Sequence, residues 1–108
     1  VVDSRRCLAF HTIENRDPEL PQAISSKLEG WVAGCDICQD VCPWNQQPLR
    51  SSEDADLQPR PWLLNLQAEE ALGWSDADWD TKLRASALRR LKPWMWRRNL
   101  RASRSGTA

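Results

Sequence analysis

The segment GCDICQDVCPWN, residues 34–45, constrains the fold of this chain more than any other feature of its sequence. It contains three cysteines in the spacing C-x2-C-x3-C, and Pro43 directly follows the last of them. One further cysteine, Cys7, occurs among the 108 residues. Closely spaced thiols on a short loop predict a metal or iron–sulfur centre, and the rest of the chain must fold around it.

Three kinds of chemistry can use the four cysteines. Disulfides require an oxidising compartment, and two cysteines three residues apart form a poor structural bridge, so this use is the least favoured. A structural zinc site needs four thiolates or imidazoles around a tetrahedral ion. Cys35 and Cys38 have the spacing of a zinc knuckle, but Cys7 lies alone in the sequence and has no nearby cysteine to form a second knuckle.

An iron–sulfur centre is favoured over zinc. The bacterial ferredoxin pattern is C-x2-C-x2-C-x3-C-P, and its last cysteine binds the neighbouring cluster in two-cluster proteins. Val32 occupies the position of the first cysteine of that pattern, so Cys7 is the available replacement. If Cys42 binds a second cluster, four ligands must come from polypeptide outside these residues. A single cluster bound by all four cysteines is the competing hypothesis.

The composition agrees with a small helical unit. The chain is long enough for one small domain with a modest core. It begins at Val1, and its first residues, VVDSRRC, read as the interior of a larger protein, of which we expect it to be a fragment. No apolar stretch is long enough for a membrane helix, so no membrane is expected as a partner. Because the ligand set is divided, we predict that the isolated chain folds poorly.

The expected secondary structure is mainly α, with short helices around the cysteine loop and no strand. Each helix is predicted from a capping side chain or a first-turn proline. These starts are Asp3, for a helix with Cys7, Leu8, Phe10 and Ile13 on one face; Pro18, for a helix ending near Gly30; Pro61, for a helix through Leu72; Ser75, with Asp78 in a capping box; Ser86; and Pro93. Residues 46–61 are expected to be extended and residues 103–108 frayed. The predicted segments are an iron–sulfur segment at 1–48, a linker at 49–60, a helical segment with a basic face at 61–104, and a tail at 105–108.

Charge is divided along the chain, although the formal net charge is zero. Between Glu53 and Asp80 there are eight acidic residues and one basic residue, whereas from Lys82 onward there are nine basic residues and no acidic one. A block of one sign is often an interaction surface for nucleic acid. Equally, it can be a solvated face that balances the acidic segment beside it, and the sequence leaves both interpretations open.

Several other residues are candidates for a role at the site. His11 is the only histidine, and a packed or solvent-facing role is favoured over metal ligation. Trp44 can shield a cluster from water, but simple packing over the loop is at least as well supported. Trp94 and Trp96 can stack on RNA bases, yet burial in a helix contact is favoured. Arg97, Arg98 and Arg101 can contact phosphates or form a solvated face. The sequence shows no catalytic residue.

The chain resembles the C-terminal part of the epoxyqueuosine reductase family. The resemblance is carried by DSRRCLAFHTIEN, GCDICQDVCPWN, PRPWLL and SALRRLK…RRN, although His11 and the short tail depart from the family pattern. It implies a cytoplasmic, monomeric oxidoreductase that reduces epoxyqueuosine to queuosine in tRNA with cobalamin, bound earlier in the chain, and an external electron donor. It further implies two [4Fe-4S] clusters in a ferredoxin-like region. Cys7, Cys35 and Cys38 would bind one cluster and Cys42 the other.

Two alternatives to this function follow from the same residues. A generic ferredoxin-like electron-transfer module of another oxidoreductase would share the cysteine pattern but would have no use for the basic tail. A zinc module that binds RNA through residues 82–104 would use both features without any redox chemistry.

Overall fold

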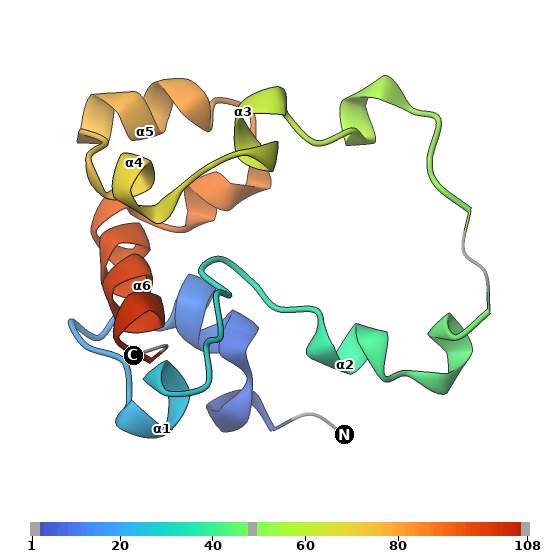
Figure 1. The fold of residues 1–108 in the computed structure, drawn as a ribbon, viewed down its shortest axis with the longest axis horizontal. Helices are drawn as coiled ribbons and strands as arrows, with labels where there is room; N and C mark the ends of the chain where they lie inside the picture. The colour runs from blue at the N-terminus through green and yellow to red at the C-terminus, as the bar shows by residue number, and fades with distance from the viewer. Residues whose placement is uncertain (1–2, 48–49, 107–108) are drawn as a thin grey trace.

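The protein is described by a computed structural model over residues 3–47 and 50–106, with side chains up to residue 103. This part of the chain is helical and contains no strand, which confirms the mainly α prediction (Figure 1). The elements are η1 (Ser4–Arg6), η2 (Phe10–Glu14), α1 (Gln22–Ser25), α2 (Ile37–Asp40), η3 (Pro43–Asn45), η4 (Ala55–Leu57), α3 (Pro61–Leu64), α4 (Ala68–Leu72), α5 (Asp76–Lys82), η5 (Ala87–Arg90) and α6 (Pro93–Gly106). None of these helices is both long and apolar enough to cross a bilayer.

Helix α6 organises the fold, because it contacts α1, α4 and η2 (Figure 1). On one side it contributes to the larger hydrophobic core, here called the tryptophan core, which consists of Ala71, Trp74, Trp79, Leu83, Leu91, Met95, Trp96 and Leu100. On the other side Ala102 packs against a much smaller core, which consists of Leu8, Ile24 and Leu28. The two cores therefore lie on either side of the same helix.

Aromatic contacts account for much of the tryptophan core. The ring centroids of Trp79 and Trp96 are 4.9 Å apart, and Trp74 stacks on Trp96 at 6.1 Å. Trp62 meets Trp74 edge to face at 5.5 Å, and Lys82 Nζ lies 5.2 Å from the Trp74 ring. Such rings bury a large apolar area and add directional contacts, so we expect them to provide most of the stability of the part of the chain that forms this core.

Trp79→Ala is expected to lower the local free energy of unfolding of α5 and α6 by about 3–5 kcal/mol, because the ring is only 3% exposed and its removal leaves a cavity. Hydrogen exchange of the α5 and α6 amides in the intact protein measures this change. Trp94→Ala is the matched control: its ring is 42% exposed, and we expect a loss of about 1 kcal/mol or less. Equal losses in the two variants would contradict this account of the core.

The predicted helix starts are confirmed at several positions. Ser75 and Asp78 form a complete capping box at the start of α5, and Ser86 caps η5 through the Leu88 amide. Pro61 is the first residue of α3, and Pro93 begins α6. Each of these signals lies within a few residues of the helix start that it produces, so it can be recognised in the sequence.

The predicted lengths of two helices are wrong. The helix expected from Pro18 to Gly30 is reduced to α1, which begins after Pro21 and ends at Ser25. Adjacent serines compete with the helix for backbone hydrogen bonds, and Gly30 is left-handed at φ +92°. The helix expected from Pro61 to Leu72 is broken into α3 and α4 at residues 65–67, where Asn65 leaves the helical conformation.

The two ends of the chain also differ from expectation. Asp3 caps a single 3-10 turn, and residues 10–14 then form a π-helix with Asn15 N donating to the Phe10 carbonyl, so the expected face is not formed. Leu8 is buried, but Phe10 is exposed. At the other end α6 continues to Gly106, and Ser103 is buried, so fraying from residue 103 is wrong; residues 107–108 lie outside the described range.

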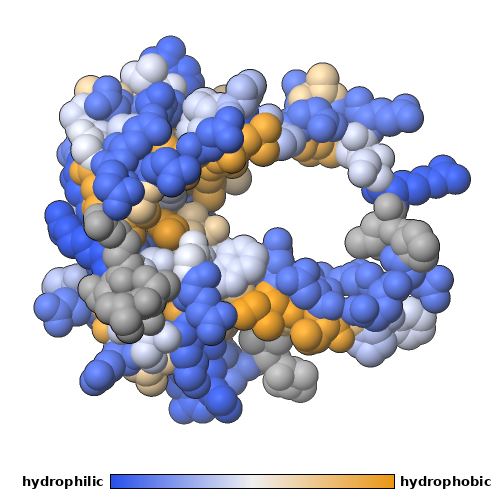
Figure 2. Space-filling view, in the orientation of Figure 1, coloured by the Kyte–Doolittle hydropathy of each residue, from blue (hydrophilic) through white to orange (hydrophobic). Residues whose placement is uncertain are grey.

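Residues 36–59, here called the arm, leave the helical body and return to it (Figure 1). No described residue of the arm is buried, and Figure 2 shows open space between it and the body. The expected extended connection at 46–61 is largely irregular, interrupted by the short η4, and two of its residues, 48–49, lie outside the described range. The arm thus lacks a hydrophobic core of its own.

Candidate metal centre

The four cysteines lie on two different parts of the molecule. Cys7 ends η1 and precedes Leu8 of the small core, and Cys35 packs against that same core. Cys38 lies in α2 and Cys42 directly before η3, both on the arm. All four are free thiols, and Cys38 is the most exposed. Within the described residues, no three His, Cys, Asp or Glu side chains are close enough together to hold a metal ion.

The turn after Cys35 is suited to a sulfur ligand. The Ile37 amide donates to Cys35 Sγ at 3.5 Å, and hydrogen bonds of this kind stabilise a thiolate and tune the potential of a bound cluster. Gly34 precedes Cys35 at φ +86°, a conformation that favours glycine, and its amide donates to Thr12 Oγ1 at 3.0 Å. The backbone around Cys35 is thereby defined on both sides of the sulfur.

The backbone around Cys42 is held by side chains of its own loop. Gln46 Nε2 donates to the carbonyls of Asp40 at 2.7 Å and Cys42 at 3.0 Å. Asn45 Nδ2 donates to the Gln39 carbonyl at 3.0 Å, and Pro43 starts η3. The roles of Asn45 and Gln46 were not predicted from the sequence. The donor set of soft thiols on short loops, with the Ile37 amide donating to Cys35 Sγ, fits an iron–sulfur cluster.

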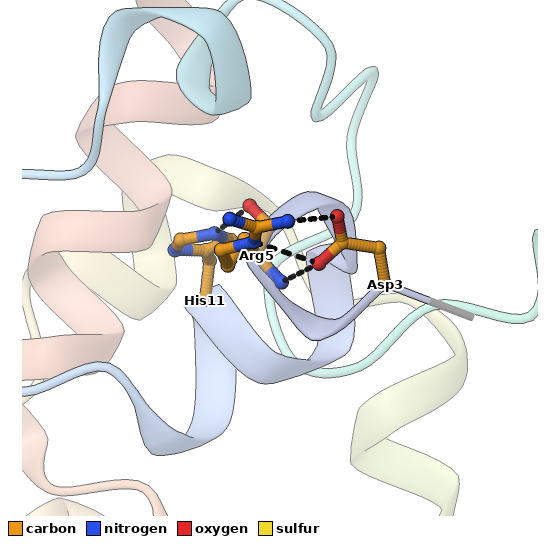
Figure 3. A network of polar contacts seen from close by, with 3 residues as sticks. All are labelled: Asp3, Arg5 and His11. Atoms are coloured by element: carbon orange, nitrogen blue, oxygen red, sulfur yellow. Dashed lines mark hydrogen bonds and ion pairs between the residues drawn. The ribbon is translucent and has the colours of Figure 1, made fainter.

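The turn before Cys7 is fixed by a polar network (Figure 3). The Asp3 carboxylate accepts hydrogen bonds from the side chain and the backbone amide of Arg5, which lower the pKa of Asp3. His11 Nε2 donates to the Arg5 carbonyl at 2.8 Å, and His11 Nδ1 accepts from Asn15 Nδ2 at 3.0 Å. With both ring nitrogens bonded and the ring buried, His11 is a packed histidine, as predicted.

Arg98 is buried, unlike either of the two roles considered for it from the sequence. Its side chain is 7% exposed and donates to the carbonyls of His11, Asn15 and Asp17 at 2.7 to 2.9 Å. Burial lowers the pKa of Arg98, but a guanidinium with three carbonyl partners stays protonated at neutral pH. Both interpretations offered for Arg98 from the sequence, a phosphate contact and a solvated face, are therefore wrong, because the group faces the interior.

Part of the basic segment pairs with the acidic one. Arg97 donates to Asp76 at 2.6 Å and to the Trp74 carbonyl at 3.0 Å, and Arg89 pairs with Asp80 at 3.2 Å. The charge-balance interpretation therefore holds for these two residues. Arg101 is exposed and forms no ion pair with any described residue, so it is free to meet an anion.

The three candidate tryptophans have different environments. Trp44 is 88% exposed, so packing over the cysteine loop is wrong. Trp96 is buried in the tryptophan core, as the helix pattern predicts. Trp94 is 42% exposed, so its predicted burial is wrong. The Arg98 guanidinium lies over one face of the Trp94 ring, 5.4 Å from the ring centroid.

Comparison with known proteins defines the class of this site. Residues 1–45, which include all four cysteines, match the 4Fe-4S double cluster binding domain. The chain therefore carries a domain of that class, which favours iron–sulfur over zinc. No solved structure shows significant similarity to the chain.

Curated relatives are similar to this chain over most of its length. The chain is 67% identical over 103 residues to a protein of Synechococcus sp. (strain CC9605), covering 95% of this chain and 32% of that protein. It is 56% identical to a protein of Prochlorococcus marinus (strain NATL2A), at 93% and 32% coverage, and 38% identical to one of Francisella cf. novicida (strain Fx1), at 93% and 27%. All three are named epoxyqueuosine reductase. The chain is similar to the C-terminal part of these proteins and spans about a third of their length.

Proposed function

We propose that this chain is the cluster-bearing part of an epoxyqueuosine reductase. The intact enzyme reduces the epoxide of epoxyqueuosine in tRNA to queuosine, and this part relays electrons from an external donor to cobalamin bound by polypeptide outside the chain. The observation that carries the proposal is that a double cluster domain containing every cysteine occurs in a chain 67% identical to a named reductase. The clusters supply one-electron chemistry, while the protein sets their orientation and potential.

We assign Cys7, Cys35 and Cys38 to one [4Fe-4S] cluster and Cys42 to the other. Cys7 and Cys35 adjoin the same small core, and Cys38 follows Cys35 by three residues, which supports a shared cluster. The loop around Cys42 is held by its own hydrogen bonds from Gln46, which supports the assignment of the Cys42 sulfur to a different cluster from that of Cys35 and Cys38. The remaining four ligands would come from polypeptide outside this chain, in a ferredoxin-like arrangement.

The arm supports this division of ligands. Ile37 begins α2 and Val41 directly follows it, so the two lie on either side of Cys38, and both are exposed, as is Trp44. An apolar surface beside cysteine ligands is costly in water, so it fits a loop that is covered when the clusters and the remaining polypeptide are in place. In this proposal residues 1–48 form the iron–sulfur segment, 49–60 the linker, 61–104 the helical segment and 105–108 the tail. The intact enzyme is proposed to be monomeric and cytoplasmic.

Metal analysis of the intact protein tests the function. After anaerobic purification we expect about eight iron atoms and as many labile sulfides per molecule, because two cubane clusters are proposed. The protein should convert epoxyqueuosine to queuosine in tRNA, and its binding to tRNA should weaken steeply as salt rises, because phosphate contacts release counterions. Zinc in place of iron would overturn the proposal. Normal iron content without tRNA binding would favour a generic electron-transfer module.

A further inference from the structure

Helix α6 is tied to the cysteine-bearing half by three buried polar side chains, here called the α6 clamp: Arg98, Asn99 and Ser103. Arg98 donates to three carbonyls of the segment after Cys7. Asn99 Nδ2 donates to the carbonyls of Thr12 and Val32, each at 2.8 Å. Ser103 Oγ accepts from the Gly30 amide at 3.1 Å. The clamp therefore holds two segments that are distant in the sequence.

Asn99 is the central member of the clamp. It is fully buried, and its amide nitrogen joins the Thr12 carbonyl, in the π-helix after Cys7, to the Val32 carbonyl, three residues before Cys35. Its side-chain oxygen accepts from Arg98 Nε at 3.0 Å, which orients both groups. A single side chain thus sets the spacing between the two segments.

Thr12 extends the same connection to the cysteine loop. It is fully buried, and its hydroxyl donates to the Leu8 carbonyl at 2.8 Å while it accepts from the Gly34 amide at 3.0 Å. Leu8 directly follows Cys7, and Gly34 directly precedes Cys35. The hydroxyl therefore joins the immediate neighbours of two cysteines through two hydrogen bonds.

We propose that Asn99, Arg98 and Thr12 are positioning residues that set the separation and orientation of Cys7 and Cys35 as ligands of one cluster. The inference rests on the proposed cluster. Cluster ligands are tuned by groups that fix their backbone, and the small core alone, with three buried side chains, offers little further constraint. The clamp supplies that constraint from a helix that itself carries no cysteine.

Arg97 provides a matched control on the same helix. Like Arg98, it donates to a backbone carbonyl and to a side-chain oxygen, but its partners are Trp74 and Asp76, in a part of the chain without cysteines. Loss of Arg97 therefore removes two hydrogen bonds from α6 without altering the cysteine segments.

The test compares Asn99→Ala, Thr12→Val and Arg97→Ala in the intact, anaerobically purified protein. The readouts are the electron paramagnetic resonance spectrum of the reduced clusters, their midpoint potentials and the rate of iron loss to a chelator. We expect Asn99→Ala to accelerate iron loss by about tenfold or more and to shift one cluster's spectrum and potential. Thr12→Val, which keeps the side-chain volume, should shift the same cluster by a smaller amount. Arg97→Ala should match the parent.

The outcomes separate the inference from the function. If the parent holds both clusters and Asn99→Ala resembles Arg97→Ala in all three readouts, the positioning role is overturned while the proposed function stands. If Asn99→Ala does not fold, Thr12→Val decides: a spectrum and potential equal to the parent's would overturn the inference. A parent protein without iron would overturn the proposed function itself.

Discussion

Cys35→Ala in the intact protein is expected to reduce queuosine formation by at least about 100-fold, above the loss typical of an outer-sphere change. The thiolate is proposed as a ligand of the cluster that Cys7 and Cys38 would share, and no other cysteine of this chain is available to replace it, because Cys7, Cys38 and Cys42 already have assigned roles. Anaerobic turnover with epoxyqueuosine-containing tRNA, together with iron analysis, measures the effect.

Asp40→Asn is the control for that loss. Asp40 lies in α2 between Cys38 and Cys42, its side chain is exposed, and only its backbone carbonyl accepts a hydrogen bond from Gln46. The substitution changes one charge in the same loop and should leave the iron content and activity near those of the parent. A comparable loss in this variant would mean that the loop is merely sensitive to any change.

Cys42→Ala distinguishes two clusters from one. If Cys42 binds a different cluster, this variant should keep the spectroscopic signal that Cys35→Ala removes, and lose the other. If both variants remove the same signal, and the parent contains only about four iron atoms, all four cysteines bind one cubane and the two-cluster assignment is wrong.

The sequence predicted those parts of the fold that depend on local chemistry. The capping box at Ser75 and the proline at the start of α6 each lie within one turn of the helix start that they produce. The residues that form these signals are therefore close together in the sequence and can be recognised there. The cysteine spacing likewise indicated the class of centre, since a short loop can present several thiolates to one cluster. In each case the sequence separation of the interacting groups is a few residues.

Features that depend on distant partners were not predictable from the sequence. Arg98 belongs to a basic run and resembles its exposed neighbour Arg101, yet its three carbonyl partners lie more than 80 residues earlier in the chain. The break between α3 and α4 also involves a distant partner, since Leu66 within the break packs against the tryptophan core. Helix propensity is a weak prior, and tertiary contacts override it.

The two halves of the structure should respond differently to the removal of iron. The eight buried residues of the tryptophan core all follow position 70 and include no cysteine, and from the cysteine-bearing segments only the partly buried Val32 and Ala33 pack against it. Those segments otherwise have only the small core, and the arm has no buried described residue. If the clusters substitute for a core in the cysteine half, their free energy of binding is also its free energy of folding.

Anaerobic removal of iron from the intact protein is therefore expected to unfold the arm and loosen residues 3–35 while α4, α5 and α6 stay folded. Protease cleavage within 36–59 should accelerate by at least about tenfold, because amides without buried contacts open readily. Hydrogen exchange of the α5 amides should change little. This expectation refines the prediction that the isolated chain folds poorly, by confining the failure to the cysteine half. One cooperative transition that includes α5, or an arm that stays protected without iron, would show that the clusters are not what hold this half together.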